Sequence, residues 1–452
     1  MSRILFVENR HRTRVWEIIA AGLAEQGHTI SWMVMNHGFA PQSPNVSLLP
    51  YPRRQDLAPA GNRFQSIVDA DRRIRYYGYT ADHYVHYNSH IRRILRVTQP
   101  ELVIGESTQF YELLTIEACR EFGIRYIAPA SARYPTGRFV CCEADTLNVV
   151  GGSGDVPGEE DLSRFVNQLV SRTIVPDYMK AVAAGKKESR AWKDGPDWAF
   201  KAIQYVRGER YCSPPPLKKL REGRIVQRSL ALWNQSAREA KRRITGQSRL
   251  RVLFPLHKQP EASVDVWGRP YADQAALVDV LSSSLGEDAA LMVKPNPKPG
   301  LELSDVLLDV AARRSSIVPL ATTVTMHEAF ESADLIVTVT GTVAIESIFA
   351  RKPCATLVRT RNNDVSGCRF LESPADLGLV VAALQAGTFP MQSEEEVMAF
   401  AARLYAESYP GIISDPYSAP EVTSQQNRKH LTNAFNRLIP ALLAEKKEMQ
   451  LV

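Results

Sequence analysis

Short apolar runs alternate with amphipathic stretches near the start of the chain. Residues 3–7 and 28–35 are rich in β-branched and aromatic side chains, which is typical of strands. Between them, residues 15–26 carry apolar positions at helical spacing and are followed by a glycine, which favours a helix that ends there. Strand, helix and strand in this order form a βαβ unit and therefore predict a parallel sheet.

The same alternation continues to residue 128. A polar helical region is expected over residues 60–98, strands over 102–105 and 125–128, and a helix over 111–122. These elements predict a Rossmann-like domain over residues 1–150. Residues 151–248 begin with Gly-Gly-Ser-Gly and continue through charged helical stretches, which predicts a helical insertion and linker without strands of its own.

A second alternating region begins near residue 250. Strands are expected over 251–255, 289–294, 316–320, 334–339 and 354–358, and helices over 272–285, 303–313, 326–332 and 343–350. Two more helices are expected over 394–408 and 424–446. The pattern predicts a second Rossmann-like domain over residues 249–420 and a C-terminal helix over 421–452. The predicted fold class is α/β, with the two Rossmann-like domains facing each other across a cleft.

Composition narrows the class of protein. The 452 residues are 44% hydrophobic and 23% charged, as in soluble globular proteins. No stretch approaches the ~20 apolar residues that cross a bilayer, and the first residues resemble a strand rather than a signal peptide, so a cytoplasmic protein is expected. The six cysteines lack metal-ligand spacing, which disfavours zinc. The net charge of +6 suits an anionic ligand or membrane surface, and no nucleic-acid-binding motif is present.

Four segments of the second domain follow predicted strands and should converge on one edge of its sheet. They are residues 255–261, 294–297, 322–326 and 340–342. The turn Thr340–Thr342 leads a strand directly into a helix, whose free N–H groups suit a phosphate, and Gly341 permits a close approach. Lys294 would add a positive charge, and Glu261 or Glu346 could bind ribose hydroxyls.

The first domain offers candidate carboxylates and cations. Glu106 follows a strand and could act as general base or as nucleophile toward a sugar, or merely favour a helix dipole. Asp145 is an alternative carboxylate. Arg133 and Arg138 could clamp a carboxylate or phosphate, or belong to a surface loop. Arg12 lies in a basic cluster that could bind an anionic acceptor or phospholipid headgroups, or simply be solvated.

Several common cofactor-binding and catalytic motifs are missing from the sequence. No GxGxxG follows a predicted strand, so a dinucleotide is disfavoured, and neither a Walker A nor a GxSxG motif is present. We therefore expect no cofactor and no metal, with a nucleotide-sugar as substrate rather than as prosthetic group.

Three segments of the second domain resemble those of a known family. Phe254–Glu261 resembles the PL…QPE segment of bacterial capsule polysaccharide biosynthesis glycosyltransferases, which include Kdo-transferase-like and sialyltransferase-like enzymes of GT-B fold. Residues 291–297 look like their K-x-H-P segment, and residues 338–353 like their S/T-x-x-x-E…G-K-P segment. The order is the family's, and the likeness covers about residues 250–360. Asn296 replaces the family's histidine, and Arg351 the glycine before Lys-Pro.

The resemblance implies a function and further site residues. In the family the second domain holds a nucleotide-activated sugar, often a CMP-linked acid, and the first holds the acceptor and the catalytic carboxylate. His257, Gln259 and Glu261 would then shape the donor pocket, with Asn296 near the phosphate. The implied protein is a metal-independent glycosyltransferase that moves a sugar to a surface polysaccharide or glycolipid, with possible peripheral contact with the cytoplasmic membrane face.

The sequence leaves two other hypotheses about the function open. A UDP-sugar 2-epimerase or a transferase of polyol phosphates from CDP donors would use a similar architecture. A non-catalytic component of a polysaccharide assembly complex would retain the fold without the reaction.

Overall fold

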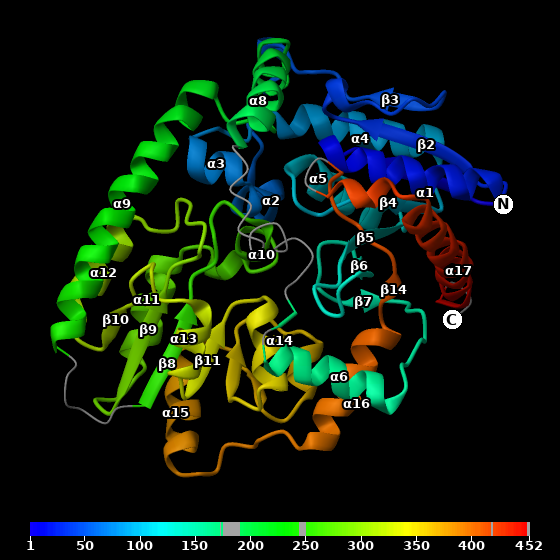
Figure 1. The fold of residues 1–452 in the computed structure, drawn as a ribbon. Coiled ribbons are helices and arrows are strands. Elements are labelled where there is room, and N and C mark those ends of the chain that lie inside the picture. Colours follow the sequence, from blue (N-terminus) through cyan, green and yellow to red (C-terminus); the bar gives the residue numbers. More distant parts are fainter. Residues whose placement is uncertain (172, 175–189, 244–249, 417–418, 450–452) are drawn as a thin grey trace. The chain divides into compact units, whose positions relative to one another are not determined.

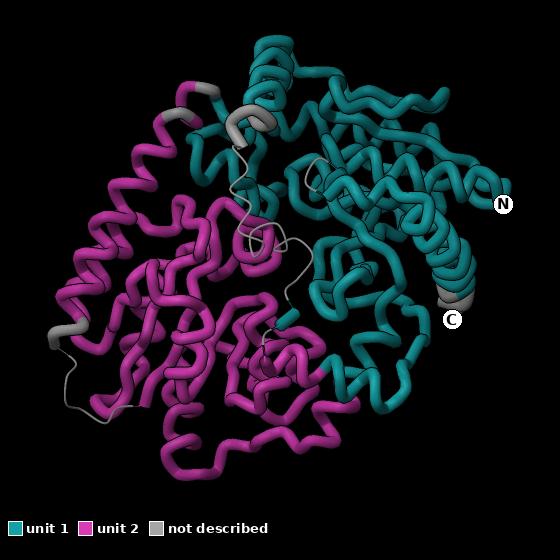
Figure 2. Tube along the Cα trace, in the orientation of Figure 1, with its two compact units in different colours: residues 1–165, 172–215, 401–452 teal, residues 166–171, 216–400 magenta. Residues whose placement is uncertain are grey.

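The computed structural model describes residues 1–171, 173–174, 190–243, 250–416 and 419–449. The chain forms two compact units (Figure 2). Unit 1 comprises residues 1–165, 172–215 and 401–452, and unit 2 comprises residues 166–171 and 216–400. The sequence-based segments 1–150, 151–248, 249–420 and 421–452 divide the chain differently, because the units group residues by contact rather than by order along the chain.

Unit 1 is built on a mixed sheet with the order β14-β6-β5-β4-β1-β2-β3, and β7 pairs with β6 (Figure 1). Five neighbouring strands are parallel: β1 (Arg3–Val7), β2 (Thr29–Val34), β3 (Val46–Leu48), β4 (Leu102–Ile104) and β5 (Arg125–Ser131). Three are antiparallel additions: β6 (Arg138–Glu143), β7 (Val149–Val150) and β14 (Tyr409–Pro410). The central strands β1 and β4 are almost wholly buried apolar residues, as expected for a sheet covered on both faces.

Helices complete unit 1. They are α1 (Thr13–Glu25), α2 (Gln65–Ala70), α3 (Arg72–Tyr77), α4 (Tyr84–Thr98), α5 (Phe110–Glu121), α8 (Arg190–Val206) and α17 (Gln425–Met449), and α6 (Glu159–Val170) begins there. Helix α17 packs against α1, and Phe435 of α17 stacks on Phe139 of β6 with ring centroids 5.6 Å apart. This apolar contact attaches the C-terminal helix to the sheet that begins with residue 3.

Unit 2 is built on a wholly parallel sheet with the order β10-β9-β8-β11-β12-β13. Its strands are β8 (Leu250–Pro255), β9 (Ala289–Lys294), β10 (Ile317–Pro319), β11 (Leu335–Thr338), β12 (Cys354–Thr356) and β13 (Cys368–Phe370). Its helices are α9 (Pro216–Arg243), α10 (Ala262–Asp265), α11 (Gln274–Ser283), α12 (Asp305–Arg313), α13 (Met326–Glu331), α14 (Thr342–Phe349), α15 (Leu377–Gln385) and most of α16 (Glu394–Ala406). β-Branched and leucine side chains of β8, β9 and β11 form its core.

The predicted α/β class with two Rossmann-like sheets is confirmed. Within the described part of residues 151–248 the structure contains helices and no strand, as expected. The pattern missed the short strands β3, β7, β13 and β14, the helix α15 and, with most consequence, β6. Residues 60–98, expected to be helical, contain a 3-10 helix (Asn62–Phe64) and the helices α2, α3 and α4. Among the residues described, no helix has the length and apolar character needed to span a bilayer.

Candidate functional site

The parallel strands of each unit have one point at which their order reverses. In unit 2 the chain moves outward from β8 through β9 and β10, then returns to the other side of β8 with β11. The reversal therefore lies between β8 and β11. In unit 1 the corresponding point lies between β1 and β4. Ligands of open α/β sheets bind beyond the carboxyl ends of the strands at such points, so the adjoining loops define two candidate regions.

The carboxyl edge of unit 2 brings together three of the predicted segments. Lys294 ends β9 opposite Pro255 of β8, and extension of the β8–β11 register places Thr338 at the same level on the other side. His257 Nε2 lies 3.3 Å from Thr338 Oγ1. Since neighbouring strands are about 4.8 Å apart, Lys294 and Thr338 are separated by about two strand spacings.

Lys294 is the most unusual group at this edge. The residue is 3% exposed, and its Nζ donates to the carbonyl of Pro295 at 3.1 Å. Within the described part of the chain no carboxylate forms an ion pair with it, and burial lowers the pKa of its ammonium. A buried cation is costly unless an opposite charge accompanies it, so this side chain is suited to an anionic ligand.

The residues of the turn before α14 have different roles. The Thr340 hydroxyl is buried and donates to the carbonyl of Ser263 at 3.1 Å, so it anchors the turn. Gly341 has φ 112° and ψ 176° and precedes the helix without a side-chain cap. Thr342 is half-buried and is the first helical residue. The first N–H groups of α14 therefore receive no capping side chain from Gly341 and retain the capacity to bind an anion.

The loop after β8 is fixed by an amide network. Gln259 is 4% exposed, and its Nε2 donates to Asp265 Oδ1 and to the carbonyl of Ala272, both at 2.8 Å. Gln274 bonds the backbone of His257 through both its side-chain oxygen and nitrogen. Gln259 thus holds the loop in shape, and no sequence pattern indicated its partner Gln274.

Three other predicted donor-site residues lie near the surface. Glu261 is exposed and precedes α10. Asn296 is half-buried and its Oδ1 accepts from the backbone N–H of Lys298 at 3.0 Å, which shapes a local turn. Glu346 lies half-buried in the second turn of α14.

The carboxyl edge of unit 1 holds Glu106 in a polar cluster. Its Oε1 lies 2.6 Å from Arg12 Nε, and its Oε2 accepts from Asn9 Nδ2 at 3.0 Å. Arg12 and Asn9 belong to the loop after β1, and Glu106 belongs to the loop after β4. The two predicted residues Glu106 and Arg12 therefore meet at the reversal of strand order.

Sequence reasoning missed a second carboxylate in this cluster. Glu112 is fully buried, and its Oε1 accepts from Asn9 Nδ2 at 2.8 Å. Its Oε2 accepts from the N–H groups of Thr108 and Gln109, each at 2.8 Å. Burial, followed by the charge of Glu106, raises the pKa of Glu112 to about 8. The spacing from Gln109 to Glu112 indicates a capping box, which the structure contains.

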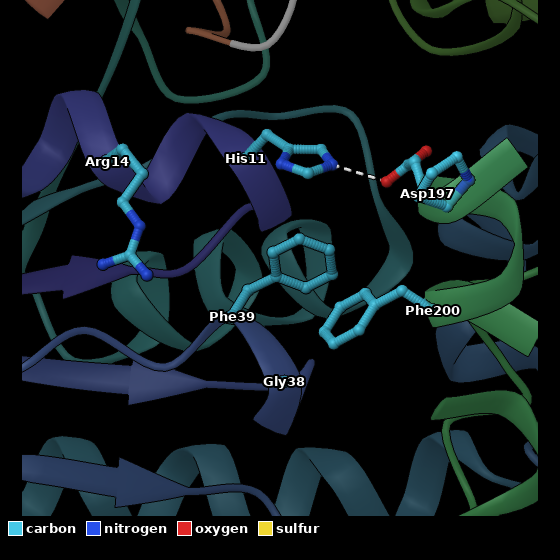
Figure 3. Close-up of a pocket in the computed structure, with 7 residues that line it drawn as sticks. His11, Arg14, Gly38, Phe39, Asp197 and Phe200 are labelled. Atoms are coloured by element: carbon cyan, nitrogen blue, oxygen red, sulfur yellow. Dashed lines mark hydrogen bonds and ion pairs between the residues drawn. The ribbon is translucent and has the colours of Figure 1, made fainter. Parts of the chain in front are cut away.

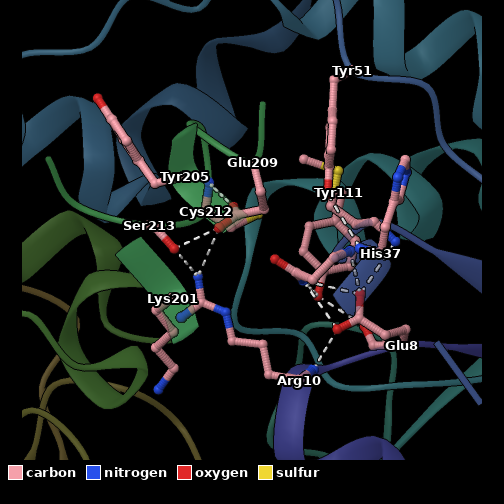
Figure 4. A network of polar contacts seen from close by, with 12 residues as sticks. Glu8, Arg10, His37, Tyr51, Tyr111, Lys201, Tyr205, Glu209, Cys212 and Ser213 are labelled. Atoms are coloured by element: carbon pink, nitrogen blue, oxygen red, sulfur yellow. Dashed lines mark hydrogen bonds and ion pairs between the residues drawn. The ribbon is translucent and has the colours of Figure 1, made fainter. Parts of the chain in front are cut away.

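A buried polar network lies behind this edge (Figure 4). Glu8 accepts from the N–H groups of Met35 at 3.1 Å and Asn36 at 2.8 Å, and burial raises its pKa. The guanidinium of Arg10 donates to Ser213 Oγ at 2.9 Å. The pairing of residue 10 with residue 213 joins two of the three chain segments of unit 1, and no local pattern could have revealed it.

Two predicted residues of the first domain have other positions. Because β6 runs antiparallel to β5, it carries the chain back to the amino ends of the parallel strands. Asp145 follows β6 and therefore lies at the edge opposite Glu106, where it pairs with Arg120. Its assignment as an alternative catalytic carboxylate is corrected accordingly.

Arg138 is the first residue of β6 rather than part of an open loop. Its guanidinium donates to Ser408 Oγ and Ser153 Oγ, both at 2.8 Å, and to the carbonyl of Ser408 at 2.7 Å. These bonds fix the β6–β14 edge, so the expected anion clamp is corrected to a structural role. Arg133 lies half-buried in the β5–β6 turn with φ 64°.

The described residues contain no group of three or more histidine, cysteine or acidic side chains arranged to hold a metal ion.

No protein-family model matches the sequence, and no curated protein matches it. Solved structures similar to this chain include glycosyltransferase VinC in complex with dTDP, at 14% identity over 98% of this chain and 100% of that chain, with a TM-score of 0.28. MurG of Acinetobacter baumannii is 10% identical over 96% and 99%, with a TM-score of 0.27. UDP-GlcNAc 2-epimerase of Neisseria meningitidis bound to UDP-GlcNAc is 9% identical over 97% and 99%, with a TM-score of 0.25. These values identify neither a substrate nor site residues.

Proposed function

We propose that this chain is a glycosyltransferase that uses a nucleotide-activated sugar, with the nucleotide phosphates bound at the carboxyl edge of unit 2. The supporting observation is the buried ammonium of Lys294, which has a backbone carbonyl as its partner and lies beside the β8–β11 reversal. The uncapped start of α14 at Gly341 would add N–H donors. Both features favour an anion, and both would stabilise the charge on a departing nucleotide.

The reaction also requires a base for the acceptor hydroxyl, and we assign this role to Glu106 of unit 1. Arg12 and Asn9 orient its carboxylate, and Glu112 shares Asn9 with it. A carboxylate held in this way can accept a proton from a hydroxyl that attacks the sugar. The acceptor is proposed to be a surface polysaccharide or glycolipid, and CMP-linked sugars are the first donors to examine, on the motif resemblance of residues 250–360.

Nucleotide binding tests the first part of this proposal. Titration calorimetry of the full chain with CMP, CDP, UDP and dTDP should detect binding to at least one nucleotide, and the preferred base would identify the donor class. Absence of binding at millimolar concentrations of all four would refute a nucleotide-sugar enzyme and favour a non-catalytic role in an assembly complex.

The chemistry needs a separate assay. Each nucleotide-sugar of the preferred base is incubated without acceptor, and the sugar is analysed by NMR. Epimerisation of the donor alone would overturn the transferase proposal. Glu106→Gln should abolish sugar transfer to a supplied glycan and leave the nucleotide affinity unchanged, because Glu106 belongs to unit 1. An active Glu106→Gln variant would remove this residue from the mechanism.

A further inference from the structure

A pocket of about 330 Å³ lies within unit 1 (Figure 3); it shares the loop after β1 with the candidate region of that unit but is lined by neither Glu106 nor Arg12. Its lining comes from three segments: the loop and first turn after β1, residues 38–39 after β2, and the middle of α8. The volume is at the lower end of the range for small-molecule sites, so a ligand with one ring would fit.

Two phenylalanines form an aromatic wall of the pocket. The rings of Phe39 and Phe200 meet edge to face with centroids 5.3 Å apart, and Phe200 remains 36% exposed. Gly38 permits this approach, because a Cβ atom there would lie 2.8 Å from Phe200 Cζ and 2.8 Å from Gln204 Cδ. Open aromatic edges and faces of this kind favour a planar apolar group.

The acidic side chain of the pocket, Asp197, is paired with basic neighbours. Asp197 Oδ1 lies 2.7 Å from His11 Nε2, and Asp197 Oδ2 lies 2.6 Å from Lys201 Nζ. Burial acts to raise the pKa of Asp197, but the hydrogen bonds from Lys201 and His11 outweigh it and lower the pKa. The carboxylate is therefore ionised at neutral pH and its charge is balanced by its neighbours, so it does not repel an incoming anion strongly.

Arg14 places a positively charged side chain at the pocket. Its side chain is 53% exposed, and its Nη1 bonds Glu17 Oε2 at 2.7 Å. Within the described residues this carboxylate is its only ion-pair partner. A guanidinium has five N–H donors, so Arg14 retains donors for an anionic group next to the aromatic wall.

We propose that this pocket binds a small aromatic anion, with its ring against Phe39 and Phe200 and its phosphate or carboxylate group on Arg14. The inference rests on unit 1 alone and does not depend on the proposed glycosyltransferase activity. It adds to the protein a ligand site for a compound that need not be a nucleotide.

Phenyl phosphate is the probe, titrated into the full chain by calorimetry, with inorganic phosphate and phenol as comparators. We expect phenyl phosphate to bind more tightly than either comparator, because only it contacts both the aromatic wall and Arg14. Arg14→Gln and Phe200→Ala should each weaken its binding about tenfold or more. Circular dichroism would establish that each variant is folded.

The chain offers a matched control for each variant. Arg164 is also an exposed arginine in an i,i+3 ion pair, and Trp198 is an exposed aromatic residue of α8 that does not line the pocket. Arg164→Gln and Trp198→Ala should bind phenyl phosphate normally. Undiminished binding by folded Arg14→Gln or Phe200→Ala would overturn the proposal, as would equal affinity for inorganic phosphate.

Different experimental results would refute the pocket proposal and the glycosyltransferase proposal. If Lys294→Met abolishes phenyl phosphate binding, the probe occupies unit 2 and the pocket proposal is rejected. If phenyl phosphate binds as described while no nucleotide binds, the pocket stands and the glycosyltransferase proposal fails.

Discussion

Replacement of Lys294 by methionine should separate anion binding from folding stability. Methionine has a similar length and no charge, so it can occupy the same buried space. A hydrogen bond from a charged group is worth about 1.5–3 kcal/mol. If Lys294 binds a nucleotide phosphate, Lys294→Met should therefore weaken nucleotide binding roughly 10- to 150-fold.

The stability of the unliganded protein should respond in the opposite sense. In the native state the ammonium is buried with a carbonyl as its acceptor, so its removal relieves a desolvation cost and the free energy of unfolding should stay equal or rise. A loss of binding that accompanied a loss of stability would indicate a damaged fold instead.

The pH dependence provides a second signature. Burial lowers the pKa of Lys294 below its ordinary value of 10.5. Between the lowered pKa and 10.5 the unfolded chain holds more protons than the native state, so stability from this group rises with pH in that window. Lys294→Met should lack this rise, which denaturant unfolding at a series of alkaline pH values would measure.

Lys298→Met is the matched control, because Lys298 is an exposed lysine four residues further along the chain, in the loop that follows β9. It should retain both the nucleotide affinity and the alkaline pH profile. The proposed role of Lys294 is refuted if folded Lys294→Met binds nucleotide as tightly as the parent chain. It is also refuted if the variant is less stable by more than about 2 kcal/mol, a loss typical of a broken buried charge network.

Three further outcomes are expected. Because the pKa of Glu112 is raised to about 8, the native state holds more protons than the unfolded chain between pH 4.5 and 8. The contribution of Glu112 to stability therefore falls as the pH rises through this window. Glu112→Gln should flatten this part of a profile of melting temperature against pH. Gly152→Ala should destabilise unit 1 by about 1–3 kcal/mol in urea unfolding, because its Cβ would lie 2.3 Å from the carbonyl of Ala406. Gly158→Ala, which has open space, should change little. Trp233→Phe should cost about 1 kcal/mol, since the indole N–H donates to a backbone carbonyl at 2.9 Å.

The predictions for unit 2 held best where strands are central and parallel. Buried β8, β9 and β11 consist of continuous apolar runs that the sequence displays directly, and each is followed by a polar segment. Because parallel strands end at one edge, the order of elements alone was enough to place Lys294, His257 and the Thr340–Thr342 turn along that edge. Their roles in binding stay predictions.

The predictions for unit 1 failed at β6. This strand pairs antiparallel with β5 after a short turn. The pattern of apolar and polar residues in a strand does not indicate whether it runs parallel or antiparallel to its neighbour. Because no strand was expected over residues 138–143, the sequence could not show that Asp145 lies at the edge opposite Glu106. The direction of β6 also brings Arg138 to the serines of residues 153 and 408.

The sequence by itself determined the kinds of element, their order and the parallel sheets, because hydrophobic period and strand–helix alternation are properties of neighbouring residues. The tertiary structure decided which polar groups meet. Glu112 joins Glu106 through Asn9, and Asp197 reaches His11 across 186 positions. Such contacts depend on strand direction and on packing between distant segments, and the free energy that selects them arises only once the chain has folded.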